Sequence, residues 1–127
     1  MARKKVPAET DFDAVFARLR AILTPYAPGM VVMKDEPGYY YLDTTKTCAN
    51  KKPSFFGAAK MHRSYVSYYL MPVYANPELL DGTSDELRKR MQGKSCFNFT
   101  AVDDLLFEEL ADLTKAGHDW YKDANLA

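Results

Sequence analysis

The chain has 127 residues, of which 47% are hydrophobic, and its 17 basic residues balance its 17 acidic residues. This length and composition predict one globular domain with a buried core and exclude a largely disordered chain. The balanced charge provides no global field that would attract nucleic acid or an anionic membrane, so we expect neither partner. No apolar run approaches the roughly 20 residues that a membrane helix requires.

The two cysteines, Cys48 and Cys96, are too few for a disulfide scaffold and lack the CxxC spacing of redox and zinc sites. The first residues are basic, but the apolar segment of a secretory signal does not follow them. We therefore expect a cytoplasmic protein. Residues 1–9 are predicted to form a flexible basic arm, and residues 10–127 are predicted to form a single domain.

The first predicted element is a helix over residues 11–24, because apolar side chains recur there at helical spacing. They are Phe12, Val15, Phe16, Leu19, Ile22 and Leu23. Thr10 is a suitable N-cap, with Asp13 placed to complete a capping box. Pro25 ends the helix.

A strand over residues 30–34 should follow, because this run is short and apolar. The sequence at 35–38 ends in Pro-Gly, which favours a tight turn with a positive φ at the glycine. Residues 39–42 should return antiparallel to the first strand. The polar residues 43–53 are then predicted to form a long loop.

Residues 54–74 are the stretch around which the fold is expected to form. Two extended segments meet there at a polar corner, residues 61–64, and the second segment, 65–71, is rich in tyrosine and apolar residues. Pro72 cannot donate to a strand ladder and so should end this strand or lie at a bulge. Three small residues in the first segment, Gly57, Ala58 and Ala59, predict close packing by a neighbouring element.

The region after this hairpin should contain two short helical segments. The first follows Pro77, and the second is capped by Thr83 or Ser84, with Glu86 in capping-box position to Thr83. Gly93 should end the second segment in the left-handed conformation.

Residues 95–100 alternate in polarity, which predicts a last strand with Phe97 and Phe99 on one face. A long amphipathic helix over residues 102–121 should follow. Strands bracketed by helices and joined by short connections predict an α+β fold. We expect two layers: an antiparallel sheet of about five strands with the N- and C-terminal helices packed on one face.

Tyrosines are the most informative candidates for a binding site, because nine of them exceed what a small core accommodates easily. Strand alternation places Tyr65 and Tyr69 on the sheet face away from the helices. Tyr39 and Tyr41 are expected on the same face. The cationic side chains predicted to rim this surface are Lys60, Arg63 and Lys94. The pattern favours a non-enzymatic module, a monomer or homodimer without cofactor, that binds a small anionic or aromatic ligand.

Two alternatives involve other side chains. The carboxylates of Asp104, Glu108 and Asp112 follow one face of the last helix and are of the type that holds ferrous iron or a hard cation. We favour a solvated helix face for them. Cys48 and His62 are of the types that form a cysteine–histidine pair, which would make a cysteine-dependent enzyme. We favour an exposed turn for His62 and a core position for Cys96.

Three segments, SYVSYYLMPVY, NPELL and SDELRKRMQGKSCFNF, resemble the YdhG-like family, a domain of unknown function found in small bacterial proteins. The resemblance covers roughly residues 12–120. It implies an α+β domain with an antiparallel sheet and packed helices. Some members are described as frataxin-like iron chaperones, which implies iron on surface carboxylates, here those of the last helix. The resemblance implies no catalytic residues.

Overall fold

The computed structural model describes residues 12–47 and 53–124. The predicted basic arm, the Thr10 cap and Cys48 lie outside the described residues. The helices are α1 (Phe12–Leu23), α2 (Met71–Ala75), α3 (Asp85–Arg88) and α4 (Asp104–Asp123), with 3-10 helices η2 (Thr24–Gly29) and η3 (Pro77–Leu80). The strands are β1 (Met30–Glu36), β2 (Tyr39–Thr47), β3 (Pro53–Met61), β4 (Val66–Leu70) and β5 (Cys96–Phe99).

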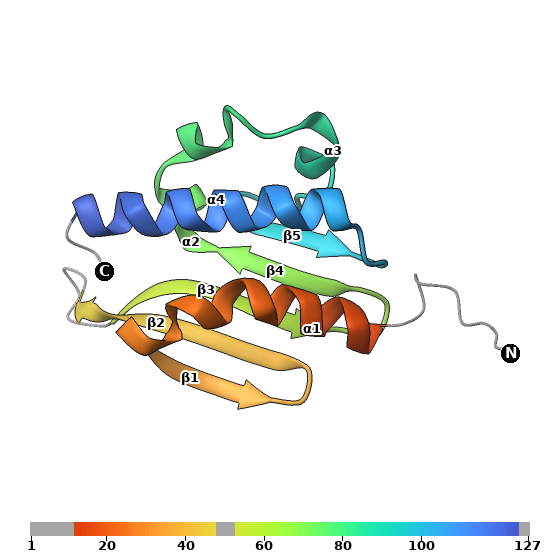
Figure 1. The fold of residues 1–127 in the computed structure, drawn as a ribbon, viewed down its shortest axis with the longest axis horizontal. Helices are drawn as coiled ribbons and strands as arrows, with labels where there is room; N and C mark the ends of the chain where they lie inside the picture. The colour runs from red at the N-terminus through yellow and green to blue at the C-terminus, as the bar shows by residue number, and fades with distance from the viewer. Residues whose placement is uncertain (1–11, 48–52, 125–127) are drawn as a thin grey trace, which may run out of the picture.

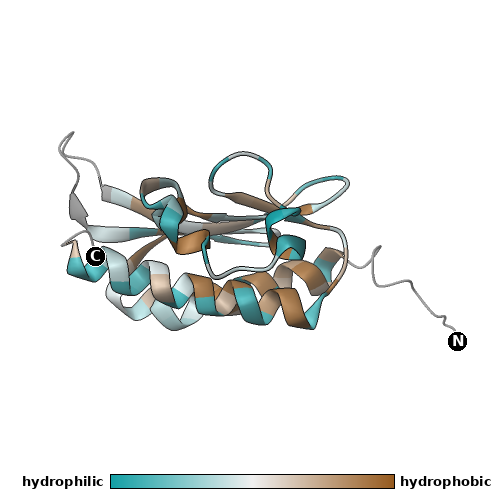
Figure 2. Cartoon of the chain, turned by 90° about the horizontal axis from the view of Figure 1, so that it is seen from above, coloured by the Kyte–Doolittle hydropathy of each residue, from teal (hydrophilic) through white to brown (hydrophobic). Residues whose placement is uncertain are grey.

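The five strands form one antiparallel sheet in the order β1-β2-β3-β4-β5 (Figure 1). Seen from above, α1 and α4 form a second layer on one side of this sheet (Figure 2). An ion pair links the two helices, because Arg18 Nη2 in the middle of α1 lies 2.7 Å from Asp104 Oδ1 at the start of α4. The predicted two-layer α+β fold is therefore confirmed. No described helix combines the length and the apolar character needed to span a membrane.

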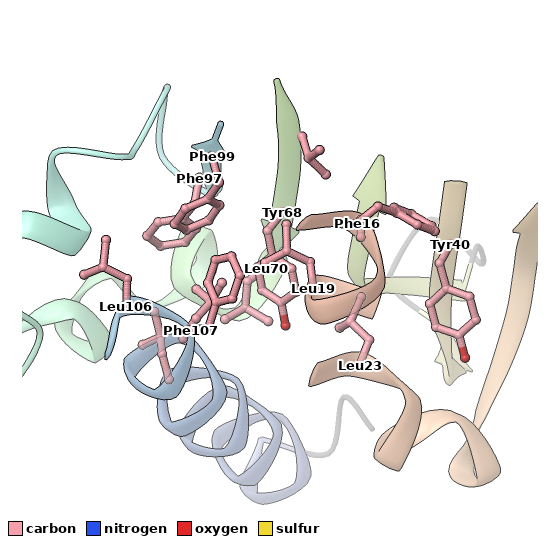
Figure 3. Close-up of a cluster of buried hydrophobic side chains, with 14 of the residues drawn as sticks. Phe16, Leu19, Leu23, Tyr40, Tyr68, Leu70, Phe97, Phe99, Leu106 and Phe107 are labelled. Atoms are coloured by element: carbon pink, nitrogen blue, oxygen red, sulfur yellow. The ribbon is translucent and has the colours of Figure 1, made fainter. Parts of the chain in front are cut away.

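The core lies between the sheet and the two helices, and Figure 3 shows its side chains. Strand β4 contributes every second residue, Val66, Tyr68 and Leu70, and all three are completely buried. Helix α1 contributes Leu19 and Leu23 from its facing side. The predicted alternation of β4 is therefore confirmed.

Helix α4 starts two residues later than predicted because Asp103 acts as its N-cap. The Asp103 carboxylate accepts a hydrogen bond from the Leu106 N–H at 3.1 Å, which satisfies one of the free amides of the first turn. The buried side of the helix consists of Leu106, Phe107, Leu110, Leu113, Thr114, Gly117 and Tyr121. This stripe packs the helix against the sheet and α2.

The predicted loop over residues 43–53 was wrong at both of its ends. Strand β2 continues to Thr47 and β3 begins at Pro53, and these two residues pair. Asp43 and Thr44 are buried in the sheet, although their polarity suggested a loop. A bulge in β3 accompanies this longer hairpin, since Leu42 pairs with Gly57 while Asp43 pairs with Phe55. Long-range pairing has overridden local composition here.

The second short helix was also predicted too long. Ser84, not Thr83, is its N-cap and accepts a hydrogen bond from the Leu87 N–H at 3.2 Å. After Arg88 the chain turns to cover the edge of β5, where the Asn98 N–H donates to the Arg90 carbonyl at 2.8 Å. Gly93 has the predicted positive φ of 91°, but it lies in this turn and not at a helix end.

A buried chain of hydroxyls joins the sheet to α4. Thr114 Oγ1 donates to the Leu110 carbonyl at 2.7 Å, so the Tyr68 hydroxyl must donate to Thr114 Oγ1, also at 2.7 Å. Burial raises the pKa of Tyr68 strongly. The phenol therefore remains a donor throughout the ordinary pH range.

We expect Tyr68→Phe to lower the free energy of unfolding by about 0.5–1.5 kcal/mol, because it removes this buried hydrogen bond. Chemical denaturation measures the change, and Tyr74→Phe is a matched control because Tyr74 is exposed. The double variant Tyr68→Phe/Thr114→Val should lower the free energy of unfolding by less than the sum of the two single changes. Strict additivity would show that the two hydroxyls are not coupled.

Candidate ligand-binding site on the open sheet face

The sheet face opposite α1 and α4, here the open face, presents two rows of side chains set by the strand register. The Lys60 row consists of Tyr39, Lys60, Ser67 and Asn98, each paired with the next across β2, β3, β4 and β5. The Ala58 row consists of Tyr41, Ala58, Tyr69 and Cys96, paired in the same way. Side chains directly opposite one another in adjacent strands lie in contact range.

A cavity of about 250 Å³ opens on this face, and we call it the aromatic slot. Its lining residues are Tyr39, Tyr41, Phe55, Ala58, Lys60 and Tyr69. Ala58 separates Tyr41 from Tyr69 in the Ala58 row and carries only a methyl group. Ala58 is buried beneath the surrounding side chains, and its small methyl group is part of the slot lining.

The rings on the β2 side support one another. Phe55 stacks on Tyr41 with ring centroids 4.7 Å apart and an interplanar angle of 29°. Tyr39 meets Tyr41 edge to face at 6.1 Å. Lys60 Nζ lies 4.9 Å from the centre of the Tyr39 ring. Mutual packing of this kind stabilises the arrangement of these side chains.

The slot combines neutral phenols with one positive charge. Burial, reinforced by the nearby Asp43 carboxylate, raises the pKa of the Tyr41 phenol. Burial also raises the pKa of the Tyr69 phenol. Both hydroxyls therefore stay protonated at neutral pH. Lys60 forms no ion pair with any acid of the described residues, so its charge is available to a ligand.

Four of the seven residues predicted for the site come together in the slot: Tyr39, Tyr41, Lys60 and Tyr69. The other three, Tyr65, Arg63 and Lys94, are not among the described residues that line it. The Tyr65 ring instead packs on His62 at 4.7 Å, while Arg63 and Lys94 are exposed in turns.

Phe55 and Ala58 were missed in the sequence. Strict alternation from Lys60 would turn Phe55 into the core, but the β3 bulge places Phe56 there and brings Phe55 to the open face. The sequence predicts a packing contact at Ala58, whereas the structure places this residue between two tyrosines in the Ala58 row. The pairing of Ala58 with Tyr41 and Tyr69 was the signal that could have identified it.

His62 is not the freely solvated turn residue that we expected. It is half-buried, and its Nε2 atom is buried without a hydrogen-bond partner among the described residues. Burial, followed by the charge of Lys60, lowers the pKa of the imidazole. Because Cys48 lies outside the described residues, its predicted pairing with His62 has no described geometry.

Cys96 is likewise not a core residue. It is half-buried at the end of the Ala58 row on the open face. Burial raises the pKa of its thiol, so the sulfur is protonated at neutral pH and is a poor nucleophile. On the open face the Cys96 thiol is a weak hydrogen-bond donor, with its Sγ atom 3.5 Å from Asn98 Oδ1.

The three acids of the iron-binding alternative lie along the exposed side of α4. Asp104 is engaged with Arg18, and Glu108 and Asp112 are exposed. Within residues 12–47 and 53–124, no group of three or more histidine, cysteine, aspartate or glutamate side chains is arranged to hold a metal ion. The described geometry therefore offers no support for iron coordination.

A larger cavity, about 480 Å³, lies beside the start of α4. Its lining residues are Ser84, Glu86, Lys89, Arg90, Asp103, Leu105, Leu106 and Glu109. The Glu109 carboxylate already accepts hydrogen bonds from the Ser84 N–H at 2.8 Å and from its hydroxyl at 2.7 Å. Its lining mixes both signs of charge, and none of the described residues in it is aromatic. The aromatic slot is the better organised of the two despite its smaller volume.

No family model, curated protein or solved structure matches the chain.

Proposed function

We propose that the protein is a non-enzymatic binding module whose aromatic slot takes a small, flat, anionic aromatic compound. The observation that carries this proposal is the composition of the slot: its lining consists of four aromatic rings, one alanine and one ammonium that has no acidic partner among the described residues. A volume of about 250 Å³ lies just below the usual range of ligand pockets, about 300–1,000 Å³. It therefore favours a ligand of one or two rings.

The two preferences of the slot have separate physical origins. Preference for a flat ring follows from the aromatic lining, since Tyr41 and Tyr69 flank Ala58 in register and both line the slot. Preference for an anion follows from Lys60, because its ammonium forms no ion pair within the described part of the chain and lies over the Tyr39 ring. None of the described residues that line the slot carries an imidazole, a thiol or a carboxylate, which supports binding over catalysis.

We also propose that the chain is a YdhG-like protein of the bacterial cytoplasm. The two-layer α+β fold is the one that this resemblance implies, and the absence of a membrane-spanning helix in the described residues is compatible with it.

A thermal-shift experiment with 2-naphthylacetate tests the binding proposal. We expect this compound to raise the melting temperature of the wild type by a few degrees at saturation, because it binds only the folded state. Cyclohexylacetate, which has the same charge but no aromatic ring, should produce a much smaller rise.

Two variants connect the effect to the slot. Ala58→Leu enlarges a side chain of the slot lining, and Tyr69→Ala removes one wall, so both should abolish the response to 2-naphthylacetate. Arg63→Ala and Tyr65→Ala are matched controls outside the slot and should respond like the wild type. Equal responses in all five proteins, or no response in the wild type, would refute the proposal.

A further inference from the structure

We infer that Lys60 and Asn98 together bind the acidic group of the ligand, and that the ligand is an arylalkanoate with one or two carbons between ring and carboxylate. This inference rests on the proposed function, since it assumes that the ring occupies the aromatic slot. It adds a residue outside the slot lining, Asn98, and a length requirement on the ligand.

The amide of Asn98 is held in one orientation by its neighbours. The buried hydroxyl of Ser67 donates to Asn98 Oδ1 at 2.7 Å, and the Cys96 thiol donates to the same oxygen at 3.5 Å. Two donors on Oδ1 direct the Nδ2 group away from them. Nδ2 donates to none of the described residues, so both of its hydrogens are free for a ligand.

Lys60 faces Asn98 across Ser67 in the same row. Lys60 pairs with Ser67 on one side, and Asn98 pairs with Ser67 on the other. Adjacent strands are about 4.8 Å apart, so the two backbones are separated by roughly 10 Å. In the structure the Lys60 ammonium lies 4.9 Å from the centre of the Tyr39 ring, so it would turn from that ring toward Ser67 to meet a carboxylate, while the Asn98 amide would approach from the β5 side.

The neighbouring charges leave this position favourable for an anion. The nearest acid of the row is Glu36, which pairs in register with Tyr39 but forms its ion pair with Lys34 at 3.6 Å. Lys60 has no acidic partner among the described residues. A carboxylate above Ser67 would therefore receive one charge-assisted hydrogen bond from Lys60 and another from Asn98.

The spacing of the two rows sets the length of the ligand. The Ala58 row and the Lys60 row are two residues apart along each strand, which corresponds to about 6.8 Å. A ring centred over Ala58 with a carboxylate bonded directly to it falls short of the Lys60 row. A chain of one or two carbons carries the carboxylate to that row.

Isothermal titration calorimetry with four probes tests the inference: benzoate, phenylacetate, 3-phenylpropanoate and the neutral 3-phenylpropanamide. We expect 3-phenylpropanoate to bind the wild type about tenfold more tightly than benzoate or 3-phenylpropanamide. Asn98→Asp replaces the donating side-chain amide with a negative charge. It should lower the affinity for 3-phenylpropanoate at least tenfold and the affinity for the neutral 3-phenylpropanamide much less. Lys60→Met should likewise lower the affinity for 3-phenylpropanoate more than the affinity for 3-phenylpropanamide.

The control is Lys94→Gln, which removes an exposed positive charge outside the slot and should leave every affinity unchanged. Equal affinity for acid and amide, or an unchanged affinity in Asn98→Asp and Lys60→Met, would overturn the inference. The proposed function would then still stand if Ala58→Leu abolishes binding of the probes. Failure of every probe and of 2-naphthylacetate to bind the wild type would overturn both. If Asn98→Asp does not fold, the inference is tested by Lys60→Met and by the affinities of the wild type for 3-phenylpropanoate and 3-phenylpropanamide.

Discussion

Leu110→Ala should lower the free energy of unfolding by about 2–5 kcal/mol, the range observed for large-to-small changes in well-packed cores. Leu110 is 0% exposed and belongs to the buried stripe with which α4 covers the sheet. Removing three carbons there deletes apolar burial and leaves a cavity between α4 and the core. Urea denaturation followed by circular dichroism measures the loss.

The matched control lies on the same helix. Leu105 is 75% exposed, so Leu105→Ala removes the same atoms from a water-exposed surface. It should change the free energy of unfolding by no more than about 0.5 kcal/mol. A loss below about half a kcal/mol for Leu110→Ala would mean that α4 presents a different side to the sheet.

Gly117→Ala should also destabilise the protein, by about 1–3 kcal/mol, although alanine is the better helix former by about 1 kcal/mol. A Cβ atom on Gly117 would lie 2.9 Å from Pro72 Cβ and 3.2 Å from Pro72 Cγ. The proline ring is rigid and buried in α2, so α4 itself must shift to relieve the overlap. Thermal or urea denaturation would detect the change.

Gly82→Ala is the control for Gly117→Ala, because a Cβ atom there meets no described atom within 4 Å. It should be nearly neutral. If Gly117→Ala instead stabilised the protein as helix propensity alone predicts, α2 and α4 would not be in close contact.

The elements that the sequence predicts well are those whose local signals agree with the tertiary structure. Helix α1 has its apolar residues on one face and a proline shortly after its end, and its observed bounds lie within one residue of the predicted ones at each end. The turn at Gly38 has the expected positive φ, 80°. Pro72 ends β4 as expected, because it lies in the first turn of α2.

The errors arise where distant residues decide the conformation. Asp43 and Thr44 are polar and look like loop residues, but pairing of β2 with β3 keeps them in the sheet. The short helix α3 ends at Arg88 because the residues after it hydrogen-bond to β5. Neither pairing has a local signature in the sequence.

The candidate site shows the same division. Period-two alternation places Tyr39, Tyr41 and Tyr69 on one face of the sheet, and the structure brings them together with Lys60. The bulge that adds Phe55 depends on the register between β2 and β3 and cannot be read from one strand. Sequence proximity to the corner also suggested Arg63, which lies outside the slot.

A nuclear magnetic resonance titration of the ¹⁵N-labelled protein with 2-naphthylacetate tests the binding site most directly, because it reports every backbone amide at once. We expect the largest shifts in the middle strands of the sheet, at Tyr41, Ala58 and Tyr69. Amides around the larger cavity, such as those of Ser84 and Glu109, should stay unchanged. Shifts concentrated at Ser84 and Glu109, or no shifts at saturating ligand, would contradict a binding site on the open face.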